Sequence, residues 1–103
     1  MNMNTSSLIT ETKAKFNFNL AKVHIKEKYQ NKLIVAEQGG LWKITPELIA
    51  FASLAVDEAI ILLDTYENPV EVNRVAFLAK ISSEYKTVMQ EYLDEWKKLK
   101  NIR

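Results

Sequence analysis

Residue types that commonly act as nucleophiles or metal ligands are scarce in this chain. It has no cysteine and one histidine, His24, which excludes a thiolate zinc site, a disulfide framework and a cysteine nucleophile. Leu20 and Lys28, four positions from His24 on either side, are not metal ligands, and Gly39-Gly40 lacks the Lys-Ser or Lys-Thr of a phosphate-binding loop. We therefore expect His24 to be solvated or locally hydrogen-bonded, with no metal and no cofactor bound.

Five carboxylates in the middle of the chain form the best enzymatic candidate. They are Asp57, Glu58, Asp64, Glu67 and Glu71. Paired carboxylates can bind Mg²⁺ or act as general acid and base, and the pair Asp64 and Glu71 has the order of a nuclease acidic pair on a hairpin. The lysine expected two residues after the second carboxylate is replaced by Asn73. We expect these charges to solvate strand edges instead, and we predict that the protein is not an enzyme.

Lysines interleaved with aromatic residues raise the alternative of a nucleic-acid accessory protein. The candidates for phosphate contact are Lys13, Lys15, Lys22, Lys26 and Lys28. The formal net charge is only +1, and the sequence pI of about 7.9 lies below the value of about 9 that is typical of dedicated nucleic-acid-binding domains. The net charge of the chain therefore gives no support to nucleic-acid binding.

Two aromatic residues fall outside any periodic apolar pattern. Trp42 follows Gly40 closely, and Tyr66 lies in a segment rich in turn-forming residues. Exposed aromatic side chains in loops often make contacts with partners. We therefore treat Trp42 and Tyr66 as candidates for contact with a protein partner.

Length and composition indicate one folded domain over residues 1–103. Apolar residues make up 48% and charged residues 26%, which is far from the composition of a disordered chain. The first ten residues lack a basic start followed by an apolar run, and no segment approaches the roughly 18 apolar residues of a membrane span. We expect a cytoplasmic protein that does not enter a membrane.

The fold is predicted to be α+β and mostly helical, beginning with a long helix over about residues 7–37. Ser6 or Ser7 would supply the N-cap, and Gly39 would take the left-handed conformation that ends many helices. An alternative stays open, because periodicity cannot assign a short apolar run. In it, residues 32–36 form a strand that pairs with residues 41–44 across Gln38-Gly39-Gly40.

The middle of the chain is predicted to hold a short helix and a small sheet. Thr45 is a good N-cap and Pro46 suits a first helical position, which predicts a helix over residues 46–54. Apolar segments at residues 59–64 and 69–72 flank turn-forming residues and predict an antiparallel hairpin, to which residues 41–44 could add a third strand. The run from Ile60 to Leu63 does not alternate, which predicts burial on both faces.

The last helix is predicted over residues 73–100, with Asn73 as its cap. Apolar residues recur along it at spacings of three and four: Leu78, Ile81, Tyr85, Val88, Tyr92, Trp96 and Leu99. A helix of this length spans about 40 Å, whereas a compact chain of this size has a radius of gyration of about 13 Å. The far end of this seam should therefore meet the first helix, or the same seam of a second copy.

The first helix carries two apolar stripes at about 100° per residue. One stripe holds Phe16, Leu20, Val23 and Ile34, and the nearly opposite stripe holds Phe18, Ala21, Ile25, Tyr29 and Ala36. One stripe suffices to cover a small core, so the second predicts packing against another subunit. We therefore expect a non-enzymatic homo-oligomer, most simply a dimer, with these interface candidates: Phe16, Leu20, Val23, Tyr85, Tyr92, Trp96 and Leu99.

Charge is segregated along the chain. Residues 1–40 have a net charge of +3, residues 41–72 of −5 and residues 73–103 of +3. The acidic middle could neutralise the basic ends by lying across the helices, or through subunits that meet head to tail. The sequence does not choose between these arrangements.

Several short segments carry a resemblance to a protein family. They are Lys32-Leu33-Ile34, Gly39-Gly40-Leu41-Trp42-Lys43, Leu63-Asp64-Thr65-Tyr66, Asn68-Pro69-Val70-Glu71-Val72-Asn73-Arg74, and a last helix with Tyr92, Glu95-Trp96 and Leu99-Lys100. Their order over residues 12–103 resembles small uncharacterised proteins of contractile-tailed marine bacteriophages. The resemblance implies a viral source, a place in the host cytoplasm, and a role in virion assembly or as a replication accessory. The resemblance assigns no function to any individual residue of this chain.

Overall fold

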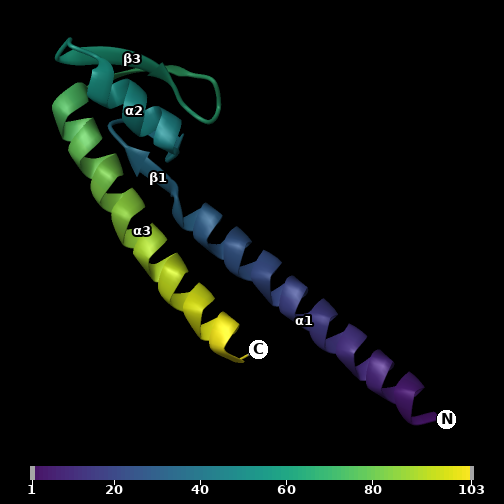
Figure 1. Ribbon diagram of the computed structural model, residues 1–103. Helices are drawn as coiled ribbons and strands as arrows, with labels where there is room; N and C mark the ends of the chain where they lie inside the picture. Colours follow the sequence, from purple (N-terminus) through teal and green to yellow (C-terminus); the bar gives the residue numbers. More distant parts are fainter. Residues whose placement is uncertain (1, 103) are drawn as a thin grey trace.

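A computed structural model describes the backbone of residues 2–102 and the side chains of residues 8–101. The elements follow the order α1 (Asn2–Lys32), β1 (Ile34–Glu37), β2 (Gly40–Lys43), α2 (Pro46–Leu54), β3 (Ala59–Leu63), β4 (Pro69–Asn73) and α3 (Arg74–Ile102). Figure 1 shows the two long helices side by side, with the short elements gathered at one end. The expected mostly helical α+β fold is confirmed.

The first helix ends five residues earlier than the main prediction placed it. α1 stops at Lys32, and β1 pairs with β2 in an antiparallel hairpin, with Glu37 opposite Gly40. Gln38 and Gly39 form its two-residue turn with positive φ of 47° and 84°, the conformation that two-residue hairpins favour. Gly39 therefore closes a hairpin and does not end a helix. The predicted helix over residues 33–37 is wrong, and the alternative with a strand is confirmed in outline.

The start of α1 also differs from the prediction. The helix begins at Asn2, so the backbone of Ser6 and Ser7 is already helical. The side chains of these two serines lie outside those that the structure describes, and the predicted N-cap contact falls there.

The middle of the chain matches its local signals closely. Thr45 Oγ1 accepts a hydrogen bond from the Leu48 amide at 3.1 Å, and Pro46 occupies the first turn of α2. β3 and β4 form an antiparallel pair from Ala59 opposite Asn73 to Leu63 opposite Pro69. These are the capping and hairpin features that the sequence predicted.

Two predictions about this hairpin are wrong. Residues 41–44 do not add a third strand to it: β2 pairs with β1, and β1–β2 and β3–β4 are two separate two-stranded sheets. β3 is not buried on both faces, since Ile60 is 9% exposed whereas Ile61 and Leu63 are 70% and 65% exposed. A two-stranded hairpin packed on one face against the core leaves its other face open, whatever its composition.

α3 is the element around which the core is organised. Asn73 Oδ1 accepts a hydrogen bond from the Ala76 amide at 3.0 Å, as expected of an N-cap. Phe77 and Ile81 are fully buried, and the Phe77 ring meets the Trp42 ring edge to face with centroids 5.0 Å apart. The short elements therefore pack on the first half of α3 and leave its second half to α1.

The molecule is a rod rather than a globule, with extents of 71 × 25 × 19 Å. α1 and α3 run antiparallel, and the N-terminal half of α1 continues alone beyond the C-terminal end of α3 (Figure 1). None of the helices in the described residues combines the length and hydropathy of a membrane span. A helix that projects in this way exposes both of its faces.

Candidate interaction site

Aromatic residues hold α1 against α3. Tyr29 and Tyr92 stack with ring centroids 5.1 Å apart and planes 6° from parallel. Phe18 and Trp96 meet at 6.0 Å near the C-terminal end of α3. The stripe of α1 that contains Phe18 and Tyr29 is thus covered within the chain, and the seam of α3 meets its own α1.

Polar side chains border this contact. The Tyr29 hydroxyl donates a hydrogen bond to Glu95, and Lys28 Nζ lies 3.1 Å from Glu95 Oε2. Lys32 forms a second ion pair with Glu91 at 3.2 Å. The Tyr29 hydroxyl and then the Lys28 ammonium lower the pKa of Glu95, and the same carboxylate raises the pKa of Tyr29 and of Lys28. These polar contacts join α1 to α3 along the edge of the aromatic contact.

Replacing Glu95 with glutamine should remove part of the acid sensitivity of folding. Because the pKa of Glu95 is lower in the folded protein, its contribution is complete above the unfolded value of about 4.5 and is lost as the pH falls through the folded pKa. The site is solvent-accessible, so the effect should be modest. Thermal unfolding followed by circular dichroism should show Glu95→Gln with the lower Tm at pH 7 and a difference that shrinks towards pH 3. A constant difference would contradict the assignment.

The second stripe of α1 has no cover in the described part of the chain. Phe16 is 64% exposed, Leu20 44% and Val23 49%. Ile9, seven residues before Phe16 and 53% exposed, extends the stripe by two helical turns. Sequence reasoning missed Ile9, although its spacing from Phe16 and Val23 was the available signal. We call Ile9, Phe16, Leu20 and Val23 the outer stripe.

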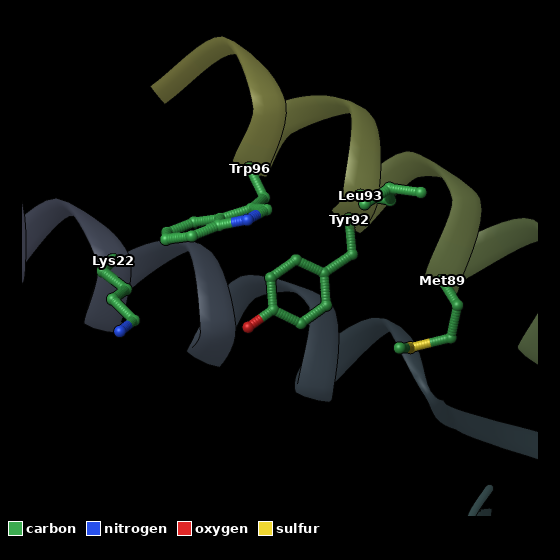
Figure 2. Close-up of a pocket in the computed structure, with 5 residues that line it drawn as sticks. All are labelled: Lys22, Met89, Tyr92, Leu93 and Trp96. Atoms are coloured by element: carbon green, nitrogen blue, oxygen red, sulfur yellow. The ribbon is translucent and has the colours of Figure 1, made fainter. Parts of the chain in front are cut away.

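A shallow groove runs beside the contact of the two long helices. Its open end is lined by Lys22, Met89, Tyr92, Leu93 and Trp96 and encloses about 270 Å³ (Figure 2). Met89 and Tyr92 also line a neighbouring hollow whose rim includes Lys26 and Lys43. A volume near 270 Å³ accommodates one or two side chains more readily than a drug-sized ligand. We call this surface the lysine groove; sequence reasoning missed Leu93 as one of its residues.

The interface candidates on α3 are partly covered within the single chain. Tyr85, Tyr92, Trp96 and Leu99 are all half-buried in the single chain. Tyr92 and Trp96 contact α1 and also line the lysine groove. Tyr92 and Trp96 can contact a second copy only through the parts of their side chains that are exposed in the groove.

Trp42 and Tyr66 have opposite environments. Trp42 is 2% exposed, packs on Phe77 and donates its indole N–H to the Glu37 carbonyl at 2.8 Å. The interpretation of Trp42 as a partner contact is wrong, because β2 turns its side chain into the core. Tyr66 is 72% exposed in the loop between β3 and β4 and is accessible to a partner.

The acidic residues do not converge. Asp64 is committed to its own backbone, accepting N–H groups of Tyr66 at 2.9 Å, Asn68 at 3.0 Å and Leu41 at 3.3 Å. These hydrogen bonds, the one from Asn68 first, lower the pKa of Asp64. Among the described residues no group of three or more histidine, cysteine or carboxylate side chains is placed to hold a metal ion. His24 is exposed on the flank of α1.

Comparison with known proteins gives no assignment. No protein-family model matches the chain, and neither curated proteins nor solved structures include a significant match. Function has to be inferred from the outer stripe, the lysine groove and the charges around them.

Proposed function

We propose that this protein is a non-enzymatic assembly protein that self-associates through the outer stripe of α1. The observation that carries the proposal is the exposure of Ile9, Phe16, Leu20 and Val23 on a helix face turned away from α3. In a two-fold dimer the same stripe would meet itself, as an isologous interface requires. The residues before Phe18, which run beyond α3, would gain a neighbour along their length.

The energetic balance limits such a dimer to one that dissociates on dilution. Four large side chains from each copy, each about half exposed before association, would contribute roughly 6–12 kcal/mol on burial. Association itself costs about 4–15 kcal/mol, so the net affinity depends on how well the two stripes pack. An isolated helix of fewer than about 12–15 residues is marginal in water, and pairing would therefore also stabilise the projecting half of α1.

Replacing Phe16 and Leu20 with glutamate should convert the protein to a monomer. Four carboxylates would face one another across a two-fold contact, while glutamate keeps a high helix propensity. Light scattering coupled to size exclusion over a micromolar concentration series should give wild-type masses approaching twice 11.9 kDa and a single-chain mass for the variant. The matched control adds two carboxylates at Asn17 and His24, which are exposed between the stripes. A single-chain mass for the wild type at every concentration would refute the proposal.

Nucleic-acid association is the second candidate, favoured by the alignment of three lysines. Lys15, Lys22 and Lys26, at spacings of seven and four, lie along one flank of α1, and none belongs to an ion pair found among the described residues. Three phosphate contacts predict that log K for duplex DNA falls with log salt at a slope of about −2.7. Fluorescence anisotropy with labelled single- and double-stranded oligonucleotides measures this slope. Absence of binding at low salt would remove the candidate.

A further inference from the structure

An exposed corner joins α2 to β3 at the end of the molecule farthest from the N-terminus of α1. Leu54 and Val56 are 81% and 88% exposed, the highest values among the large apolar residues that the structure describes. Asp57 and Glu58 follow directly, are exposed, and belong to no ion pair among the described side chains. The corner therefore presents two aliphatic side chains beside two unpaired carboxylates.

Arg74 holds the backbone of this corner in place. Its Nε donates to the Asp57 carbonyl at 2.9 Å and its Nη1 to the Ala52 carbonyl at 3.2 Å. Its backbone amide donates to the Glu58 carbonyl at 2.7 Å. An apolar protrusion that is ordered before binding loses little conformational freedom when it docks.

The lysine groove has the complementary chemistry. Its walls are apolar side chains of α3, among them Met89, Leu93 and Trp96, and Lys22 lies over the Trp96 ring at 5.5 Å. Within the described part of the chain, Lys22 and Lys26 have no carboxylate partner. The groove thus offers an apolar recess beside two ammonium groups that lack a carboxylate partner among the described residues, which suits two aliphatic side chains followed by two carboxylates.

The corner cannot reach the groove of its own chain. Arg74, which binds the corner, is the first residue of α3, and Trp96 lies 22 positions further along the same helix. At about 1.5 Å per residue the separation is about 33 Å. The carboxylates of the corner are therefore remote from the end of the groove that Lys22 and Trp96 line, and solvent ions or another molecule must balance their charge.

We propose that the acidic corner, Leu54 and Val56 with Asp57 and Glu58, docks into the lysine groove of a second copy. The contact joins different surfaces of two identical chains and is heterologous, so it repeats head to tail unless the rotation between copies closes a ring. Opposite charges on the two surfaces would speed association and fix its direction. This inference rests on the proposed self-association and adds a second contact to the outer stripe, so that dimers could be linked into larger assemblies.

The test uses chains in which the outer-stripe contact is already removed. In a Phe16→Glu/Leu20→Glu background, one partner additionally carries Lys22→Glu/Lys26→Glu and the other Asp57→Lys/Glu58→Lys. At micromolar concentration this background protein is the monomer expected above. Sedimentation velocity at low salt should show it associating as its concentration is raised towards the millimolar range. Each charge-reversed chain alone should associate about tenfold or more weakly. An equimolar mixture of the two should regain association. The intact acidic corner of the first chain then meets the intact lysine groove of the second, and the two reversed surfaces also carry opposite charges.

Each outcome is decisive, and restored association in the mixture cannot come from misfolded chains. A background protein that stays monomeric while the wild type dimerises would overturn the head-to-tail contact and leave the outer-stripe dimer standing. A mixture that remains monomeric, or charge-reversed chains that associate like the background, would also overturn it. A loss of oligonucleotide binding in Lys22→Glu/Lys26→Glu without any change in sedimentation would assign the two lysines to nucleic acid and reject the inference.

Discussion

Replacing Trp42 with alanine is expected to lower the free energy of unfolding by about 3–5 kcal/mol. The indole is 2% exposed, packs edge to face on Phe77, and donates to the Glu37 carbonyl, so its removal leaves a cavity and an unmet acceptor together. The hairpin of β1 and β2 would also lose its main attachment to α3. Urea denaturation followed by far-ultraviolet circular dichroism measures this loss of stability. The substitution leaves the α1–α3 contact at Trp96 unchanged.

Tyr66→Ala is the matched control for this change. Tyr66 is 72% exposed, so truncation should alter the unfolding free energy by less than about 0.5 kcal/mol. If Trp42→Ala instead left stability unchanged and weakened self-association, Trp42 would be a partner contact and its placement in the core would be wrong. The pair of variants therefore separates the two aromatic residues by role.

Elements whose ends are set by local chemistry could be predicted from the sequence. Thr45 with Pro46 and Asn73 with the following apolar periodicity placed the starts of α2 and α3 within one residue, because an N-cap depends on side chains two or three positions away. The hairpin of β3 and β4 was likewise indicated by turn-forming residues between two β-favouring runs. In these segments local and tertiary preferences agree.

The end of α1 could not be predicted in the same way. Leu33 to Ala36 suits either a helix or a strand, and distant contacts decide between them. Gln38, in the turn with φ of 47°, accepts the Asn73 amide at 2.7 Å and donates to the Asn73 carbonyl at 3.2 Å. This pair of hydrogen bonds joins positions 35 residues apart and helps to hold the hairpin conformation. No local pattern contains that information.

For the interaction site, the apolar periodicity predicted the two stripes of α1. It could not predict which element each stripe packs against. The stripe of Phe18 and Tyr29 faces α3, where it packs against Trp96 and Tyr92. That choice leaves Phe16, Leu20 and Val23 outward. Burial of Trp42 was missed because a four-residue strand offers no period long enough to reveal an inward face.

The rod shape changes what the charge pattern implies. In a compact domain the acidic middle could lie against the basic helices, but here it occupies the end of a molecule 71 Å long. Among the described residues, the ion pairs Lys28–Glu95, Lys32–Glu91 and Lys80–Glu84 all lie outside the acidic middle. This separation of charge is the basis on which we propose that opposite charges orient the docking of two copies.

Gly40 lies where the backbone of β2 passes its own tryptophan. A Cβ at this position would be 2.6 Å from Cζ2 and 2.8 Å from Cε2 of Trp42, closer than carbon atoms can pack. The indole cannot move away without losing its contact with Phe77 and its hydrogen bond to Glu37. Glycine is thus required here for space.

Replacing Gly40 with alanine is therefore expected to destabilise the protein by about 1–3 kcal/mol through overpacking. Chemical denaturation of Gly40→Ala gives this value, and a Trp42→Phe partner variant tests its cause. The smaller ring lacks the atoms that the new methyl group would strike, so the alanine should cost much less in Trp42→Phe than in the wild type. Equal costs in the two backgrounds would show that Gly40 is needed for its backbone conformation and not for the room it leaves to the indole.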